Sequence, residues 1–282
     1  WVQISAWPQT SQKFATEPCN HIENHKNVIT AANMKHSPLP TVSIIMPVYN
    51  AETTLKKAVA SVLAQCFQAW ELLLIEDGSQ DGSAEICARL ACQDDRIRLL
   101  WQPGNTGAAA ARNAGLTAAR GRYIAFLDAD DRWFENKLQR QLAFMHETGT
   151  VFAYSGFWRV RGSERHQVRV PERVTRADLL RGNVIGCLTA IYDREYFGTL
   201  QMPLLQMRHD FAFWLLLLEH CDEARGIDEP LAIYRVHQHS LTAGRRQAMQ
   251  ATWHMYRTHL GLPTWQSAWY MSNHLVRRCL RG

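Results

Sequence analysis

Residues 42–75 read VSIIMPVYNAETTLKKAVASVLAQCFQAWELLLI, and this stretch decides the fold. The apolar runs at its two ends, residues 42–47 and 71–75, predict strands that are buried on both faces. Between them, from Ala51 to Phe67, apolar residues recur at helical spacing. A buried strand, a helix and a second buried strand are typical of a parallel sheet whose two faces are covered by helices.

The same alternation of strands and helices continues along the chain. We expect helices at 82–91, 106–119, 137–147, 178–181 and 210–220, and strands at 97–101, 123–127, 151–161, 167–170, 188–192 and 231–235. From about Arg245 the chain reads as helices rich in aromatic and basic residues. The predicted fold class is therefore α/β, a Rossmann-like and mostly parallel sheet with helices on both faces, followed by C-terminal helices.

Composition limits the classes of function. The chain has 282 residues, of which 46% are hydrophobic and 20% charged, so it can bury a full core. Its net charge of +5 permits contact with anionic ligands or an anionic membrane surface but does not indicate nucleic acid. Seven cysteines without a CxxC pair are typical of a reduced, cytosolic protein without a cysteine-based zinc site.

Targeting signals are not recognisable in the sequence. No run reaches the roughly 18 apolar residues of a membrane-spanning helix. The N-terminus shows no signal-peptide pattern and no starting Met, so we expect a fragment or a processed chain. The expected location is the cytoplasm.

Polar residues follow several predicted strands, where ligands of such sheets bind. After the strand at 123–127 comes Asp128-Ala129-Asp130-Asp131. Alternating side chains at a strand end can aim two carboxylates at one point, and hard oxygen ligands suit Mg²⁺ or Mn²⁺. The simpler interpretation of this run alone is an acidic turn, with Asp131 capping the helix that follows Trp133.

The ends of the first two strands carry weaker signals. Asp77, within Asp77-Gly78-Ser79, either closes an ordinary turn or accepts the imide N–H of a uracil ring. Tyr49 and Asn50 form either a turn with an aromatic ring at the rim or a platform for a nucleobase.

Three further residues have a structural and a functional interpretation. Arg112 is either an exposed helical arginine or a residue that reaches a base or phosphate. Asp210 opens an apolar helix, as an N-cap or as a general base that deprotonates a hydroxyl. His237 is either structural or a contact for metal or diphosphate.

The order and spacing of these motifs carry more information than any one of them. The motifs are Pro47-Val48-Tyr49-Asn50, Glu76-Asp77-Gly78-Ser79, Ala111-Arg112-Asn113-Ala114-Gly115 and Phe126-Leu127-Asp128-Ala129-Asp130-Asp131. Together they resemble the family 2 glycosyltransferases of GT-A fold, over about residues 41–240. Later stretches, Gly182-Asn183-x-Ile185-Gly186-Cys187-Leu188-Thr189 and Tyr234-Arg235-x-His237, resemble the bacterial subgroup that builds capsules, teichuronic acids and O-antigens.

The resemblance implies a role for each matching residue. It assigns the nucleotide-sugar to Pro47, Tyr49, Asn50, Asp77, Arg112 and Asp128. It implies Asp130 as the ligand of Mn²⁺ or Mg²⁺, with Asp128 and His237 as further ligands, and Asp210 as the catalytic base. Two positions depart from the family pattern: Glu76 stands where an Asp is usual, and His209 precedes the base where an acid is usual.

The resemblance also implies a function and a division of the chain. We expect an inverting, metal-dependent transfer from a UDP-sugar to a hydroxyl of a glycan or lipid-linked glycan, which gives a β-linkage in bacterial surface polysaccharide. The expected regions are an extension or linker at 1–40 and a GT-A domain at 41–244, with a nucleotide-sugar half at 41–135 and an acceptor half at 136–244. A helical segment follows at 245–282.

The helical segment at 245–282 has two interpretations. Its helices either pack on the domain or form an interfacial segment that reaches anionic lipid. The second interpretation would place the protein peripherally on the inner face of the cytoplasmic membrane.

Two other functions compete with a glycosyltransferase. A nucleotidyltransferase should carry a Gly-rich basic phosphate loop after its first strand, and Pro47-Val48-Tyr49-Asn50 is not such a loop. A non-catalytic binding module should have lost its carboxylates, but Asp77, Asp128, Asp130 and Asp210 are all present.

Overall fold

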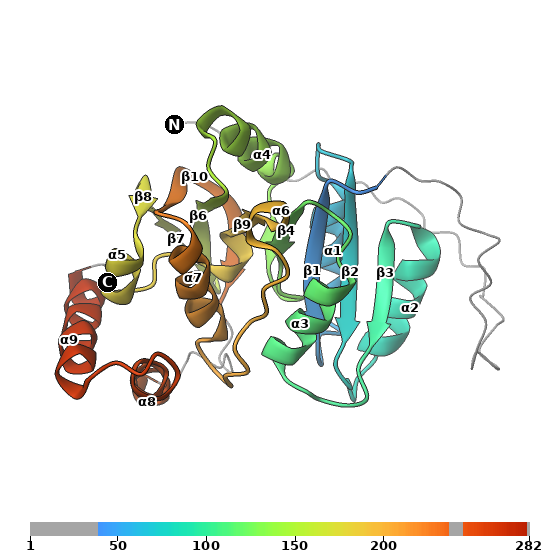
Figure 1. Ribbon diagram of the computed structural model, residues 1–282. Coiled ribbons are helices and arrows are strands. Elements are labelled where there is room, and N and C mark those ends of the chain that lie inside the picture. Colours follow the sequence, from blue (N-terminus) through green and yellow to red (C-terminus); the bar gives the residue numbers. More distant parts are fainter. Residues whose placement is uncertain (1–38, 237–244, 281–282) are drawn as a thin grey trace. The chain divides into compact units, whose positions relative to one another are not determined.

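The computed structural model describes residues 39–236 and 245–280, and its centre is a ten-stranded mixed sheet (Figure 1). The strands are β1 (Val42–Val48), β2 (Trp70–Glu76), β3 (Ile97–Trp101), β4 (Tyr123–Phe126), β5 (Arg132–Trp133), β6 (Phe152–Arg161), β7 (Glu164–Val168), β8 (Arg173–Val174), β9 (Ile191–Asp193) and β10 (Ala224–Arg235). The α-helices are α1 (Leu55–Leu63), α2 (Ser83–Gln93), α3 (Ala108–Ala118), α4 (Lys137–Thr148), α5 (Arg176–Leu180), α6 (Arg194–Phe197), α7 (His209–His220), α8 (Arg245–His254) and α9 (Thr264–Leu280). Two other helical turns are η2 (Cys187–Thr189) and η3 (Met255–His259).

The first half of the sheet is parallel. Strand β1 pairs in parallel with β2 and β4, and β2 pairs in parallel with β3. Each connection between these strands contains a helix, as the alternating apolar pattern predicts. The carboxyl ends of β1, β2 and β4 therefore meet at one edge of the sheet.

The second half of the sheet is mixed. Strand β9 pairs antiparallel with both β4 and β6 and so joins the two halves. Strand β10 pairs in parallel with β6, and the two-residue strand β5 pairs antiparallel with β10. Strands β7 and β8 pair with β6 and β10, outside the main order β3-β2-β1-β4-β9-β6-β10-β5.

The two faces of the sheet are covered by different helices. Ile44 and Met46 of β1 pack in one apolar cluster with α1, α2 and α4. Ile45, which points to the other face, packs in a second cluster with α3 and α7. A Cβ added at Gly115 of α3 would lie 2.7 Å from Ile45 Cγ2, so the small residues of α3 let this helix approach the sheet closely.

Several expected boundaries need correction: the strand expected at 231–235 begins at Ala224, and the strand expected at 167–170 spans Glu164–Val168. Pro47 does not end the first strand, because it pairs with Ile75 of β2 inside β1. The β4 partner of β1 ends at Ile45↔Phe126, so the missing N–H of Pro47 removes no bond on that side. The strand expected at 188–192 begins only at Ile191, because the amides of Thr189 and Ala190 turn back onto Gly186 and Cys187 in η2.

The C-terminal segment is helical, as expected, and packs on the domain. Met255 and Tyr256 of η3 are buried, and Tyr256 Oη donates to the Leu180 carbonyl at 2.6 Å. None of the described helices is both long enough and apolar enough to span a membrane. The extension expected at 1–40 lies almost entirely outside the described residues, and the proposed region boundaries stay a prediction.

Candidate active site

The loops after β1 and β2 are joined by hydrogen bonds. The Asn50 amide donates to Ser79 Oγ at 3.1 Å, and Asn50 Oδ1 accepts from the Gln80 amide at 2.8 Å. Glu76 accepts from the amides of Gly78 and Ser79 at 3.1 and 2.6 Å. The glutamate at this departure from the family pattern therefore fixes the turn that presents Asp77.

Asp77 is only 2% exposed and accepts three hydrogen bonds from the loop before α3. Its donors are the Thr106 amide at 2.8 Å, Thr106 Oγ1 at 2.6 Å and the Gly107 amide at 2.9 Å. An ionised carboxylate has about four acceptor sites, so one remains for a further donor. Gly78 has a φ of 75° and lies against this loop, where a side chain would collide with the Asn105 amide.

Tyr49 and Asn50 are exposed at the same edge of the sheet. The Tyr49 side chain is 43% exposed, and Asn50 adopts a φ of 48°. Val48 pairs with Glu76, so Tyr49 and Asp77 follow neighbouring strand positions. The sequence-based expectation that these strand ends share one edge is met, while the nucleobase contact stays a prediction.

Arg112 is buried, with 4% of its surface exposed, and contacts two loops that are distant in sequence. Its Nη2 donates to Asp128 Oδ1 beyond β4, and its Nη1 lies 2.6 Å from His209 Nε2 at the start of α7. Burial opposes the charge of Arg112, but the neighbouring Asp128 carboxylate raises the pKa of the guanidinium above its ordinary value. The interpretation of Arg112 as an exposed helical residue is therefore wrong.

The contacts of His209 fix its protonation. An arginine has no acceptor, so Nε2 must carry a lone pair toward Arg112. The other ring nitrogen, Nδ1, then donates to the Leu205 carbonyl at 3.3 Å. Burial lowers the pKa of His209, and the Arg112 charge lowers it further, which favours the neutral ring.

Asp210 lies beside this group, in the first turn of α7. The N-cap of α7 is Arg208, with a φ of 67°, so Asp210 does not cap the helix. The charge of Asp210 acts on both Arg112 and His209. Burial raises the pKa of the Cys187 thiol, and the charges of Arg112, Asp128 and Asp210 also act on it, which places η2 at the same site.

The acidic run after β4 divides into two parts. Asp128 and Asp130 are half-buried, whereas Asp131 is buried and its Oδ1 accepts from the Arg235 amide at 2.9 Å. Asp131 does not cap the next helix, because Arg132 and Trp133 first pair with β10 and α4 begins only at Lys137, after the N-cap Asn136.

A divalent cation fits this acidic run. Burial raises the pKa of Asp131 well above its ordinary value, and the charges of Asp128 and Asp130 add to this effect. Asp131 Oδ2 is buried without a hydrogen-bond partner among the described residues. Within that part of the chain no three His, Cys, Asp or Glu side chains lie together so that they could hold a metal ion by themselves. Carboxylates that complete their coordination with substrate phosphates are typical of Mg²⁺ and Mn²⁺.

Some site residues were missed by sequence reasoning, and one expected residue is not described. Thr106 began an expected helix and Cys187 stood inside a quoted motif, but nothing in their spacing indicated contact with Asp77 or an effect of the Arg112 charge. The Arg112–His209 contact joins residues 97 positions apart, and no local pattern reports such a contact. His237, expected as a further metal ligand, lies outside the described residues.

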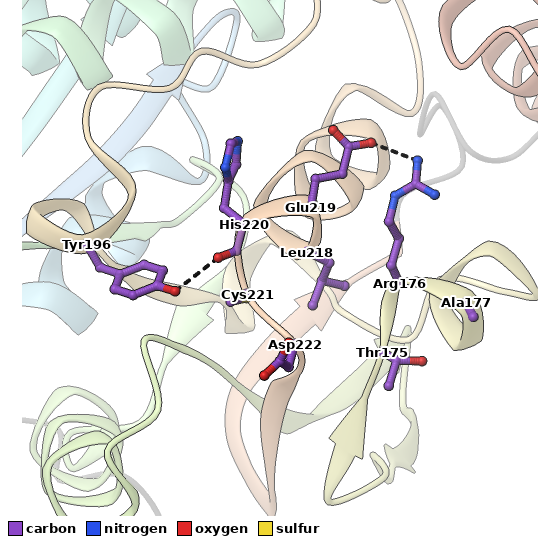
Figure 2. Close-up of a pocket in the computed structure, with 9 residues that line it drawn as sticks. All are labelled: Thr175, Arg176, Ala177, Tyr196, Leu218, Glu219, His220, Cys221 and Asp222. Atoms are coloured by element: carbon purple, nitrogen blue, oxygen red, sulfur yellow. Dashed lines mark hydrogen bonds and ion pairs between the residues drawn. The ribbon is translucent and has the colours of Figure 1, made fainter.

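A pocket at the other end of α7 is separate from this site (Figure 2). Tyr196 Oη donates to the His220 carbonyl at 3.0 Å, and Arg176 pairs with Glu219 at 2.8 Å. Because a helix rises about 1.5 Å per residue, His220 lies about 15 Å along α7 from Asp210.

Comparisons with known proteins agree with this geometry. Residues 43–206 match the model of the family described as Glycosyl transferase family 2. The chain is 39% identical over 246 residues to TuaG of Bacillus subtilis (strain 168), named as a teichuronic acid biosynthesis glycosyltransferase, covering 85% of this chain and 98% of TuaG. It is 33% identical over 237 residues to the Escherichia coli UDP-Glc:alpha-D-GlcNAc-diphosphoundecaprenol beta-1,3-glucosyltransferase WfgD, covering 83% and 92%.

Solved structures show the same fold. S. aureus TarS in complex with UDP-GlcNAc superposes with a TM-score of 0.65 at 18% identity, covering 83% of this chain and 71% of that one. The Pyrobaculum calidifontis mannosyltransferase PcManGT, in complex with GDP-Man and Mn²⁺, gives a TM-score of 0.59 at 17% identity, covering 81% and 66%. The expected GT-A fold is confirmed.

Proposed function

The chain belongs to glycosyl transferase family 2 and is a glycosyltransferase, and we propose that it moves a sugar from a UDP-sugar to a hydroxyl of a lipid-linked glycan. We propose further that the transfer is metal-dependent, inverts the anomeric carbon and builds a bacterial surface polysaccharide. The nucleotidyltransferase and the non-catalytic module are not supported by any specific observation.

One observation carries this proposal: the buried Arg112 contacts residues of the proposed donor site and also the residue next to the proposed base. Arg112 pairs with Asp128 at the sheet edge and contacts His209, which precedes Asp210. The charges of both carboxylates act on this guanidinium. A transferase needs this proximity, because the leaving diphosphate and the attacking hydroxyl must meet at one anomeric carbon.

The donor would bind along the edge of the parallel half-sheet. In this proposal the exposed Tyr49 ring stacks on the uracil, and Asp77 uses its remaining acceptor site for the imide N–H. Pro47 and Asn50 shape the same loop. The support for a uridine nucleotide is this acceptor, together with the UDP-sugar in the names of WfgD and the TarS complex.

Asp130 and Asp128 are the residues that would hold Mn²⁺ or Mg²⁺. When bound there, the cation neutralises charge on the leaving diphosphate. The support for this assignment is the chemistry of the two half-buried carboxylates, which are hard oxygen ligands at the end of β4.

Asp210 would act as the general base. It takes the proton of the acceptor hydroxyl while that oxygen forms a bond to the anomeric carbon and the bond to the diphosphate oxygen breaks. The UDP leaves from the opposite face, so an α-linked donor gives a β-linked product. The support for this role is that Asp210 lies in the first turn of α7 without capping it, and that its charge acts on Arg112.

The proposed acceptor implies contact with a membrane surface. Helices α8 and α9 expose Met249, Trp253, Trp265 and Trp269, with Trp265 71% exposed. The Arg181 guanidinium lies 5.4 Å from the Trp269 ring. Trp with nearby Arg is typical of segments at the headgroup level of a bilayer. We propose that this face binds an anionic lipid surface, with the protein on the inner side of the cytoplasmic membrane.

Calorimetric titration with UDP tests the donor and metal proposals. Mn²⁺ should tighten UDP binding by at least about tenfold, because it screens the diphosphate charge. Asp130→Asn should lose this increment, while the exposed Asp95→Asn control should keep it. UDP binding that does not change with Mn²⁺ would contradict the metal-dependent proposal.

Co-sedimentation with lipid vesicles tests the membrane proposal. The chain should bind vesicles that contain phosphatidylglycerol more tightly than pure phosphatidylcholine. Trp265→Ser with Trp269→Ser should weaken binding at least about tenfold, through lost apolar burial at about 25 cal/mol per Å². Trp101→Ser, which removes an exposed Trp on β3, is the matched control. Equal binding of the double variant and the control would refute this surface.

A further inference from the structure

We propose that His209 is a positioning residue, which holds Arg112 between Asp128 and Asp210 by accepting a hydrogen bond as a neutral imidazole. This inference rests on the proposed function for the roles of the two carboxylates. It assigns a task to the one base-adjacent position at which this chain departs from the family pattern. Protonation of His209 would then release Arg112 and disable the site.

The geometry allows only one arrangement of protons. Arg112 Nη1 lies 2.6 Å from His209 Nε2, and a guanidinium can only donate. Nδ1 must therefore carry the ring proton, and the Leu205 carbonyl lies 3.3 Å away to accept it. Both ring nitrogens are satisfied in this tautomer and in no other.

The start of α7 is fixed independently of this contact. Arg208, immediately before His209, adopts a left-handed φ of 67° that a non-glycine residue rarely adopts. Its side chain donates to Thr252 Oγ1 at 3.0 Å and to the Ala248 carbonyl at 3.4 Å, both in α8. Helix α8 thus holds the backbone that carries His209. The position of the ring is therefore set by α8, and the ring orients Arg112.

The charges around His209 make a neutral acceptor effective. Arg112 faces the ring from α3, Asp128 acts from the loop after β4, and Asp210 acts from α7 itself. An acid at this position would give Arg112 a further carboxylate, whereas imidazole supplies an acceptor without charge. Among the described residues, the carboxylates that act on the guanidinium are then Asp128 and Asp210.

Protonation of His209 would remove its hydrogen bond with Arg112. A second proton on the ring removes the lone pair that Arg112 needs and places two cations in contact in a buried site. Burial and the Arg112 charge both lower the pKa of His209, so the neutral ring persists below the ordinary histidine range. Transfer should therefore have an acid limb that belongs to His209.

Three variants test this role through the pH profile of kcat/KM for sugar transfer. His209→Leu should lower kcat/KM at least about tenfold at neutral pH, because Arg112 loses one acceptor. His209→Gln keeps a neutral acceptor and should restore activity to within about threefold of the native chain. The Gln variant should also lose the acid limb of His209. Native activity in the Leu variant, or an unchanged acid limb in the Gln variant, would overturn the proposal.

NMR of the imidazole ring tests the proposed tautomer of His209 even if sugar transfer by the chain cannot be measured. With ¹⁵N-labelled histidine, the signals that disappear in His209→Gln are those of His209. We expect Nδ1 protonated and Nε2 unprotonated, with the His209 ring still neutral at pH values below the ordinary histidine pKa. In Arg112→Gln the His209 pKa should rise. The opposite tautomer, or titration of His209 at the ordinary histidine pKa, would overturn the inference while leaving the proposed transferase activity untouched.

Discussion

At the scale of single residues, Asp77 serves the fold and the proposed donor site with one carboxylate. Its three donors all belong to the segment that begins α3. Asp77→Asn would point an amide group at these N–H donors. We expect unfolding free energy to fall by about 1.5–3 kcal/mol, the range for hydrogen bonds to a charged group, and UDP affinity to fall with it.

Urea unfolding followed by tryptophan fluorescence measures this loss. Asp95→Asn, at an exposed position, should stay within about 0.5 kcal/mol of the native chain. If Asp77→Asn matched that control, the three hydrogen bonds would contribute nothing and Asp77 would be free for ligand binding alone.

The sequence predicts individual site residues unevenly. Tyr49, Asp77 and Asp128 follow parallel strands, so the strand-end rule places them at one edge without a structure. The burial of Arg112 and its contact with His209 depend on how α7 packs beside α3, and no spacing within either segment reports that. Asp131 was expected to cap a helix because the two-residue strand β5 is too short to show a pattern.

At the scale of elements, α3 carries Arg112 and depends on a close approach to the sheet. A Cβ at Gly115 would lie 2.7 Å from Ile45 Cγ2 and 3.0 Å from Ile75 Cδ1. Gly115→Ala should cost about 1–3 kcal/mol of unfolding free energy from overpacking, although alanine favours helices by about 1 kcal/mol.

Thermal and urea unfolding of Gly115→Ala and Gly104→Ala would separate the cost of overpacking from the gain in helix propensity. Gly104→Ala adds a methyl group where no atom lies within 4 Å, so its stability should change little. Gly115→Ala should also lower transfer, because a shift of α3 moves Arg112. A Gly115→Ala chain more stable than the native one would show that helix propensity outweighs the contact with β1 and β2.

Helix α4 contains a buried lysine whose charge state depends on pH. Lys137 Nζ lies 4.0 Å from the centre of the Trp133 ring and donates to Gln141 Oε1 at 2.5 Å. Burial lowers the pKa of Lys137 from 10.5 to about 7. Between these values the unfolded chain binds more protons than the folded chain, so unfolding free energy should rise with pH, by up to about 1.4 kcal/mol per pH unit.

This contribution is complete above the unfolded pKa and is lost as the pH falls to about 7. Unfolding of the native chain and of Lys137→Met at pH 7.5 and pH 9.5, roughly within this window, measures it. The Met variant should show a smaller rise with pH, whereas Lys57→Met, on the exposed side of α1, should rise like the native chain. Equal slopes in all three chains would mean that Lys137 is charged when folded.

The apolar runs predict the parallel half of the fold well, because long buried strands and amphipathic helices each leave a periodic pattern. The second half is harder to predict. Strands β5, β8 and β9 span only two or three residues each. Strands β5 and β8 pair with β10, and β9 pairs with β4 and β6, so every partner lies far away in sequence. Leu188 and Thr189 of η2 were expected to belong to a strand, because such a short run of residues is compatible with a strand or with a helical turn.

At the scale of the whole molecule, the site unites parts that are distant along the chain. The loops of the parallel half-sheet supply Asp77 and Asp128, the α7 segment supplies His209 and Asp210, and α8 anchors Arg208. The proposed lipid surface on α8 and α9 is thus linked to the start of α7. We therefore expect one molecule of the protein to bind a vesicle and the UDP-sugar donor at the same time.

The most direct test of the central claim is transfer from a radiolabelled UDP-sugar to a lipid-linked glycan by the native chain and by Asp210→Asn. We predict that the variant binds UDP normally in the presence of Mn²⁺ but transfers at least about 100-fold more slowly, the range for loss of a general base. Near-native transfer by Asp210→Asn would contradict the assignment of Asp210 as the base and the mechanism built on it.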